Sequence, residues 1–213
     1  MTQDDTMNQN HATQNTSETS RRYPREVQMD GLVVNLRKMT SADRENALAF
    51  ARALPEHDLL FLRRDITKPE AIDVWLNGIE RGRISSILAE HEGTVVGYAT
   101  VDRGELSWSP HVAELRVLVS PKMRGKGLGR LLTQEAFAIA LGQGIEKMIA
   151  QMTVDQKGAI STFQGMGFRP EALLRDHVKD RSGKKSDLLI LSHDVAGFEA
   201  QMIGYGLNKA FEE

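Results

Sequence analysis

The chain has 213 residues, of which 40% are hydrophobic and 26% charged, and its formal net charge is -2. At about 100–200 residues per domain, this length predicts one domain with extensions or two small ones, large enough to bury a core without metal or disulfides. The absence of cysteine excludes a thiol nucleophile, a disulfide framework and a cysteine zinc site. The nearly neutral charge argues against a nucleic-acid-binding domain, and the short apolar runs argue against a membrane span.

The two ends of the chain differ in composition from its middle. Residues 1–28 are polar and charged with few large apolar side chains, which predicts a disordered N-terminal arm. Residues 29–195 form the predicted domain. Residues 196–213 form a weakly amphipathic C-terminal tail, and its pattern leaves open whether it docks as a short helix or frays. The first residues resemble neither a signal peptide nor a transit peptide, and together with the lack of cysteine this favours the cytoplasm.

Between these ends, hydrophobic periodicity predicts alternating strands and helices. Strands are expected at 32–36, 84–90, 94–100, 112–119, 147–154, 173–179 and 187–194, and helices from Thr40 or Ser41, from Pro69 to Gly82, at 128–141 and at 156–166. Glu92-Gly93 is expected to turn the first hairpin, and Arg181 to Lys184 the last. The order predicts an α/β fold, with a mixed α+β central sheet flanked by helices.

The segment from Val117 to Arg130 contains the clearest chemical signal. An apolar strand ends in Ser-Pro, a loop with glycine at 125, 127 and 129 follows, and a helix begins directly afterwards. Glycines let backbone N–H groups converge, and a helix N-terminus attracts anions. The same loop and helix start carry the basic side chains of Lys122, Arg124, Lys126 and Arg130. This combination predicts a pyrophosphate site, although a basic surface turn before an ordinary helix is the simpler alternative.

Two other phosphate-binding motifs do not fit this loop. A P-loop requires Gly-Lys followed by Ser or Thr, whereas Gly127 follows Gly125-Lys126 here. A dinucleotide fingerprint requires Gly-x-Gly-x-x-Gly, whereas this loop reads Gly-x-Gly-x-Gly.

The segment Arg-Gly-Lys-Gly-Leu-Gly, preceded by Val-x-Val-Ser-Pro, resembles the acyl-CoA-binding motif of the GNAT superfamily of N-acetyltransferases. Residues 159–168, which end in Gly-Met-Gly-Phe, resemble the second helix motif of that family, and the order of elements from Leu32 to Val195 also agrees. The resemblance implies a GNAT-like acyl-CoA N-acyltransferase fold and direct transfer of acetyl from acetyl-CoA to a primary amine of a small molecule or peptide. The expected cosubstrate is acetyl-CoA, without a metal.

The resemblance also implies the cofactor-binding residues. In this family pattern the strand amides hold the pantetheine arm and the loop amides wrap the pyrophosphate. The residues at these positions are Val117, Leu118, Val119, Arg124, Gly125, Lys126, Gly127, Leu128, Gly129 and Arg130.

Two residues are the expected catalytic groups. By position in the family pattern, the N–H of Leu118 is the expected oxyanion donor. Glu114 is the candidate base, because it lies four residues earlier on the same strand and an amine must be neutral to attack. A separation of about 13 Å along the strand requires a water or a bulge between base and amine. Pairing with Arg116 is the structural alternative for Glu114.

One family position lacks its usual side chain. Where the second motif commonly carries a tyrosine that protonates the leaving thiolate, this chain has Phe163, and Gln156 takes the place of a common asparagine. Ser161, Tyr98 and Tyr205 are the alternative proton donors. The change also supports a second hypothesis, a catalytically weak acyl-CoA-binding sensor or interaction module.

Other charged and polar groups give weaker signals. The six histidines lack ligand spacing, and Ser192-His193-Asp194 cannot form a triad because neighbours on a strand face opposite sides. The runs Arg63-Arg64-Asp65 and Glu80-Arg81 are typical of solvated faces, with an acceptor pocket as the alternative. No nucleic-acid or membrane partner is expected, the acceptor is unknown, and a homodimer is left open.

Overall fold

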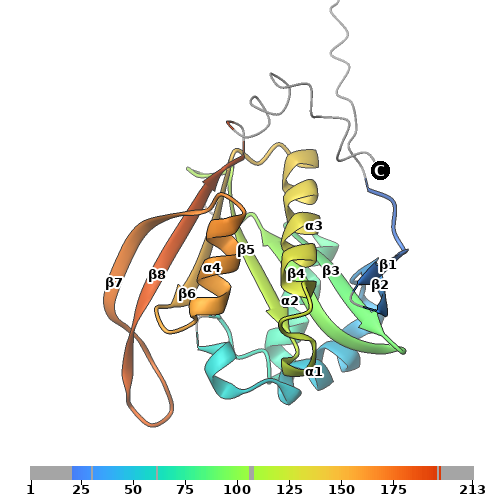
Figure 1. Ribbon diagram of the computed structural model, residues 1–213, viewed down its shortest axis with the longest axis horizontal. Helices are drawn as coiled ribbons and strands as arrows, with labels where there is room; N and C mark the ends of the chain where they lie inside the picture. Colours follow the sequence, from blue (N-terminus) through green and yellow to red (C-terminus); the bar gives the residue numbers. More distant parts are fainter. Residues whose placement is uncertain (1–20, 30, 61, 106–107, 196, 198–213) are drawn as a thin grey trace, which may run out of the picture.

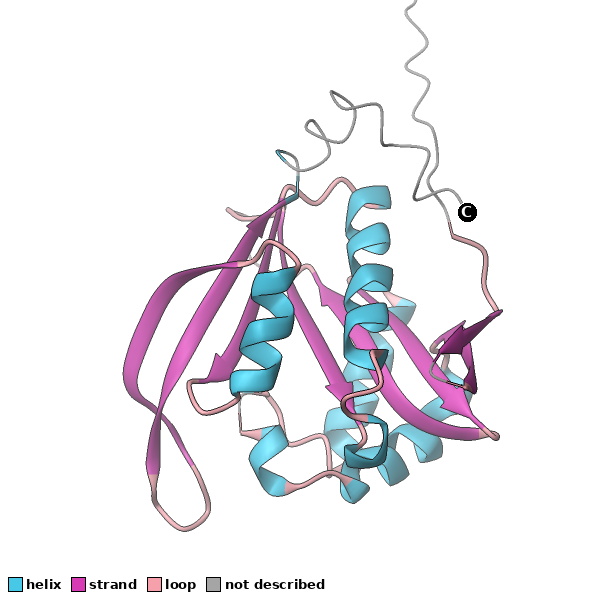
Figure 2. Ribbon diagram, in the orientation of Figure 1, coloured by secondary structure: helices cyan, strands magenta, loops and turns pink. Residues whose placement is uncertain are grey.

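The computed structural model describes residues 21–195 apart from 30, 61 and 106–107, together with residue 197. One eight-stranded sheet crosses the molecule in the order β1-β2-β3-β4-β5-β6-β8-β7, with helices on both faces (Figures 1 and 2). Its neighbouring strands are antiparallel except for the parallel pair β5 and β6. The predicted mixed sheet flanked by helices is therefore confirmed.

Most element bounds agree with the predicted periodicity. The strands are β1 (Arg25–Met29), β2 (Leu32–Lys38), β3 (Ile84–His91), β4 (Thr94–Asp102), β5 (Val112–Val119), β6 (Lys147–Thr153), β7 (Arg169–Lys179) and β8 (Lys185–Asp194). The helices are η1 (Ser41–Asp43), α1 (Arg44–Ala53), η2 (Glu56–Leu59), α2 (Pro69–Glu80), η3 (Pro121–Met123), α3 (Leu128–Gly142) and α4 (Lys157–Gly165), where η denotes a 3-10 helix. However, β1, η2 and η3 were not predicted, and β7 begins at Arg169 where 173 was predicted.

Each face of the sheet packs against its own pair of helices. Leu128 and Leu132 of α3 are fully buried on one face, where Phe163 of α4 also packs. Ile72 and Trp75 of α2 pack on the other face with residues of α1. Burial of each such large side chain contributes about 1.5–3 kcal/mol to stability. Successive side chains of a strand point to opposite faces of the sheet, so one set of β5 side chains faces α3 and α4 and the other faces α1 and α2.

The predicted hairpin of β3 and β4 is confirmed, and its turn has a specific backbone requirement. Glu92 has φ 49° and Gly93 has φ 74°. Two successive positive φ angles are those of a type I′ turn, whose twist matches that of the flanking strands.

The expected N-terminal arm is shorter than predicted. Residues 25–29 form the edge strand β1, which pairs with β2 in register from Arg25–Leu36 to Met29–Leu32. Val27 and Met29 are partly buried against the core. The prediction of disorder is therefore wrong for this segment, because pairing with an existing strand supplies the hydrogen bonds and burial that its polar composition does not indicate.

Residues 1–20 of the predicted arm and the predicted C-terminal tail, apart from residue 197, lie outside the described residues. Within the described part of the chain, no helix is long and apolar enough to span a lipid bilayer.

The strands β5 and β6 separate along their length. They are paired only from Val112–Lys147 to Glu114–Ile149, and Figure 1 shows them diverging beyond this point. From Leu115 onwards, β5 therefore has one edge that is not paired with a strand of the described structure. This opening positions the candidate site.

Candidate active site

The loop after β5 has the backbone shape that the glycine pattern predicts. Gly125 has φ 75°, and Gly127, with φ 85°, is the N-cap residue of α3. A Cβ added at Gly125 would meet nothing within 4 Å, and one at Gly127 would meet only the end of Met29 at 3.6 Å. The loop therefore leaves open space in front of a helix N-terminus, which suits a phosphate group.

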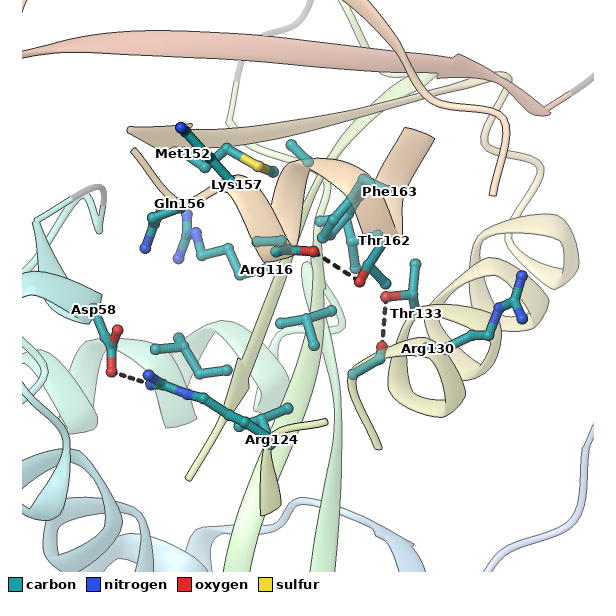
Figure 3. A pocket seen from close by; sticks show the side chains of 18 of the residues that line it. Asp58, Arg116, Arg124, Arg130, Thr133, Met152, Gln156, Lys157, Thr162 and Phe163 are labelled. Carbon is teal, nitrogen blue, oxygen red and sulfur yellow. Dashed lines mark hydrogen bonds and ion pairs between the residues drawn. The ribbon is translucent and has the colours of Figure 1, made fainter. Parts of the chain in front are cut away.

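A cavity of about 800 Å³ lies against this loop, between β5, β6, α3 and α4 (Figure 3). Its walls come from segments that are far apart in the chain. It is lined by His57, Asp58, residues 115–119, Met123, Arg124, Gly125, Gly127, Gly129, Arg130, Thr133, residues 150–152, residues 155–159, Thr162 and Phe163.

Most of the predicted cofactor-binding residues line this cavity. Val117, Leu118 and Val119 supply the strand wall, and the loop and the first turn of α3 supply the rest. Two predicted residues do not line it. Leu128 is fully buried in the core beneath α3, and Lys126 lies outside the lining.

The strand pattern gives the peptide groups of β5 distinct directions. The N–H of Ser120 donates to the carbonyl of Val96 on β4 at 2.8 Å, and Leu118 is in register with Tyr98. Because hydrogen-bonded positions alternate along antiparallel strands, the N–H of Leu118 also points toward β4. The N–H groups of Val117 and Val119 point to the open edge. The expectation that Leu118 supplies the oxyanion donor therefore does not fit this register, and Val117 is the better-placed residue.

Glu114 lies on the other face of β5 in a network of charges. Its side chain is 4% exposed, and its Oε1 accepts a hydrogen bond from Nε of Arg116 at 2.7 Å. Nη2 of Arg63 lies 2.5 Å from its Oε2. Burial lowers the pKa of Arg116, but the hydrogen bond and charge of Glu114 outweigh this and raise it. The pairing with Arg116 that was the structural alternative is therefore present.

The network continues to Asp102 on β4. Nη2 of Arg116 lies 3.5 Å from Oδ2 of Asp102, whose Oδ1 accepts a hydrogen bond from Arg83 at 2.7 Å. These groups border a second cavity of about 460 Å³, which Arg63 and Arg64 also line. Arg63 and Arg64 therefore do line a cavity, as the alternative that places them in an acceptor pocket requires. Arg116 lines both cavities, so it marks the place where they approach each other across β5.

The segment around η2 is tied to the first cavity by ion pairs. Asp58 contacts the guanidinium of Arg124, as Figure 3 shows. Nε2 of His57 lies 3.0 Å from Oδ2 of Asp155. Partial burial raises the pKa of Asp155, but the nearby Thr153 side chain and the charge of His57 outweigh this effect and lower that pKa.

Sequence reasoning missed His57, Asp58 and Asp155. The partners are far apart in the chain, and no local pattern marks an isolated aspartate as the neighbour of a loop arginine.

Phe163 serves as a packing residue. Its ring is 7% exposed and lies 5.0 Å from that of Phe168, in an edge-on arrangement. Among the suggested replacements for a tyrosine, Tyr98 is buried on the opposite face, and this burial raises its pKa. Ser161 is exposed and does not line the cavity, and Tyr205 lies outside the described residues. None of the described candidates occupies the place of Phe163.

The remaining sequence signals have structural explanations. His193 is buried beside Phe137 and Phe168, whereas Ser192 and Asp194 alternate with it on β8, as expected for residues that form no triad. Among the described residues, no group of three histidine, aspartate or glutamate side chains is arranged to hold a metal ion.

The fold and the loop define a family. The model of the acetyltransferase (GNAT) family matches residues 46–168, more than half of the chain. The chain therefore belongs to the GNAT acetyltransferase family, and it is an acyl-CoA-dependent acetyltransferase.

Individual relatives agree with this assignment. The chain is 27% identical over 130 residues to "Putative phosphinothricin acetyltransferase YwnH" of Bacillus subtilis (strain 168), covering 60% of this chain and 78% of the relative. It is also 27% identical to the crystal structure of a ribosomal-protein-alanine N-acetyltransferase from Brucella melitensis, with a TM-score of 0.66 over 75% of this chain and 98% of the other. A phosphinothricin acetyltransferase from Sinorhizobium meliloti in complex with AcCoA shares the fold at 21% identity and a TM-score of 0.66, covering 76% of this chain and 88% of that one.

Proposed function

We propose that this protein transfers acetyl from acetyl-CoA directly to a primary amine, in a ternary complex. The observation that carries the proposal is the pair of cavities on either side of β5, which share Arg116 in their linings near the opening between β5 and β6. The first has a glycine loop suited to an anion, and the second has a buried carboxylate at its border. Direct transfer is consistent with a chain that contains no cysteine.

In the first cavity, the loop and the N-terminus of α3 would bind the pyrophosphate of the cosubstrate. Arg124 and Arg130 line this part of the cavity and would supply full positive charges. The open edge of β5 would pair with the pantetheine arm through the peptide groups of Val117 and Val119. The S. meliloti acetyltransferase has the same fold and was crystallised in complex with AcCoA, which supports this placement.

In the second cavity, the acceptor amine would approach Glu114. In the ternary complex the ammonium passes a proton to the carboxylate through a water, because β5 has no bulge that would shorten the distance between Glu114 and Val117. The neutral nitrogen then attacks the thioester carbonyl carbon. The N–H of Val117 stabilises the negative charge that develops on the carbonyl oxygen. The carbon–sulfur bond breaks, and the acylated nitrogen releases its second proton to solvent. The thiolate takes up a proton from solvent, because Phe163 has none to give. The products are the N-acetyl amine and CoA.

A second candidate is an acyl-CoA-binding sensor with little activity. Phe163 favours it, because loss of a general acid removes about 10²–10⁴-fold of rate. The cytoplasmic location and the homodimer both stay predictions.

Two measurements test these functions in order. Calorimetric titration with acetyl-CoA is expected to show binding, and no binding at submillimolar concentration would contradict both candidates. Release of free CoA is then followed with a panel of primary amines that includes phosphinothricin and a peptide with an N-terminal alanine. The name of one relative contains phosphinothricin, and the name of another contains ribosomal-protein alanine, for which the peptide is a simple substitute. Turnover with any amine supports the enzyme, and tight binding without turnover supports the sensor.

A further inference from the structure

The two oxygens of the Glu114 carboxylate have unequal partners. Oε1 accepts a hydrogen bond from Arg116, a neighbour on the same strand, at 2.7 Å. Oε2 is buried and accepts no hydrogen bond from a described residue. It forms an ion pair with Nη2 of Arg63, which lies 2.5 Å away. The charge of Oε2 is thus compensated, but its hydrogen-bonding capacity is not used.

The two arginines also differ in how firmly they are held. The Arg116 side chain is 18% exposed and bridges Glu114 to Asp102. The Arg63 side chain is 55% exposed, belongs to the irregular segment between η2 and α2, and makes no second ion pair with a described residue. An exposed arginine loses side-chain conformational entropy when it is held in one geometry. Arg63 is therefore the partner that dissociates more easily from Glu114.

Arg63 also stands at the border of the second cavity. It lines this cavity with Asp102 and Arg116, whereas Glu114 lies behind the lining. A cationic group that enters the cavity therefore reaches Oε2 by taking the place of the Arg63 guanidinium. Because an uncompensated buried charge is costly, Arg63 helps Arg116 to compensate Glu114 when no amine is bound.

We propose that Arg63 is a built-in competitor of the acceptor: its guanidinium occupies the position at Glu114 that the ammonium group of a primary amine takes. This inference rests on the proposed function, since it assigns the amine to the second cavity. Arg63 is then a specificity-determining residue. It admits only those amines whose ammonium group binds Glu114 well enough to displace a tethered cation.

Competition by Arg63 lowers the apparent affinity of Glu114 for an external ammonium. If Arg63 occupies the carboxylate about nine-tenths of the time, it weakens the apparent affinity for an external ammonium about tenfold. Arg63→Ala removes the competitor and leaves Oε2 open. We therefore expect Arg63→Ala to bind ethylammonium about tenfold more tightly than the wild type does, as followed by NMR titration without acetyl-CoA.

Three further variants make this test specific. Arg81→Ala removes an exposed arginine that does not line the second cavity, and we expect it to bind ethylammonium as the wild type does. Adding Glu114→Gln to Arg63→Ala is expected to abolish the gain, because the carboxylate is the binding group. Arg63→Met keeps most of the aliphatic side chain, and it replaces Arg63→Ala if circular dichroism shows that the alanine variant is unfolded.

Equal affinity in Arg63→Ala and the wild type would overturn the proposal, and so would a gain that persists in the Glu114→Gln background. Because the titration contains no acetyl-CoA, its result is independent of turnover. Failure of acetyl-CoA to bind would contradict the proposed function and leave the exchange at Glu114 standing.

Discussion

Several side chains of the site are carboxylates that are already paired. Glu114 is held by two guanidiniums, and Asp58 is held by Arg124. In each pair, one group is expected to contact a substrate, and its partner must then either dissociate or stay bound beside the substrate. Substitution of a single partner is therefore expected to change binding or rate while the fold is kept.

Glu114→Gln tests the proposed base. The amide keeps the shape of the side chain but does not take up the proton of the ammonium, so we expect kcat/KM to fall about 10²–10⁴-fold. The affinity for acetyl-CoA is expected to stay unchanged, because Glu114 is not part of the lining of the first cavity. Steady-state kinetics across pH and calorimetry provide the two readouts.

The matched control is Asp73→Asn, which removes a carboxylate that pairs with Arg44 on the surface. Wild-type kcat/KM for Glu114→Gln over the whole pH range would show that another group accepts the proton.

Asp58→Asn tests whether the ion pair at Arg124 competes with the cosubstrate. Releasing Arg124 is expected to strengthen acetyl-CoA binding about two- to fivefold, the range for a partly exposed ion pair. Arg124→Gln is expected to weaken binding about tenfold or more, because a charge-assisted hydrogen bond to phosphate is lost. In the double variant, the gain from Asp58→Asn is expected to disappear. A gain that remained there would mean that Asp58 acts on another group.

Among the elements of the fold, the turn between β5 and α3 shows why glycine is needed at particular positions. Gly127 has φ 85°, whereas Gly129 is already within α3, where its added Cβ would lie 3.8 Å from Val119. Valine at 127 is strained by the backbone itself, by about 1–3 kcal/mol. Valine at 129 is in ordinary contact.

We expect both Gly127→Val and Gly129→Val to abolish measurable acetyl-CoA binding, because both side chains would enter the space for the pyrophosphate. Only Gly127→Val is expected to lower the free energy of unfolding by more than about 1 kcal/mol. Calorimetry and urea unfolding measure the two effects separately. Wild-type affinity in a folded Gly129→Val protein would contradict the placement of the pyrophosphate.

The packing of β8 against α3 makes stability depend on pH. His193 is 7% exposed, and burial lowers its pKa below the ordinary value of 6.5, although the neighbouring Asp194 opposes this. The unfolded chain therefore binds the proton more strongly than the folded protein does. The contribution of neutral His193 to the free energy of unfolding is therefore complete above about pH 6.5, and it is lost as the pH falls through and below that value.

His193→Gln removes this titrating group. We expect the difference in the free energy of unfolding between about pH 8 and pH 5.5 to be smaller in this variant than in the wild type. Urea unfolding at the two values measures it. Equal pH dependence in the two proteins would show that other groups cause it.

Across the whole molecule, the N-terminal segment is tied to the helix that forms the cofactor loop. Glu135 of α3 is fully buried, and Arg21 and Arg25 contact its Oε1. Tyr23 donates a hydrogen bond to its Oε2 at 2.5 Å. Burial and Glu135 together raise the pKa of Tyr23, so its hydroxyl stays protonated as a donor.

We expect Arg21→Met combined with Arg25→Met to destabilise the protein by about 3–5 kcal/mol, because a buried carboxylate loses both counter-charges. Adding Glu135→Leu is expected to restore most of this loss, since no buried charge then remains uncompensated. Urea unfolding of the three proteins provides the test. A small loss in the double variant would mean that water or another group compensates Glu135.

Much of the fold follows from local pattern. The strand at Val112–Val119, the helix that begins at Pro69 and the hairpin around Glu92-Gly93 agree with the sequence, because each depends on side-chain alternation, a fixed proline φ or a turn with positive φ. Strand β1 was missed because an edge strand is stabilised by its partner, which its own residues do not reveal.

The family, the anion loop and the candidate base Glu114 could be recognised without coordinates, because glycine spacing, strand alternation and basic side chains act over a few neighbouring residues. Pairing with β4 was needed to show that the N–H of Val117, and not that of Leu118, faces the open edge of β5. The folded chain was also needed to show that Arg63 compensates Glu114 and that Asp58 holds Arg124. These contacts join segments that are distant in the chain, and folding sets their geometry through packing that no local pattern records.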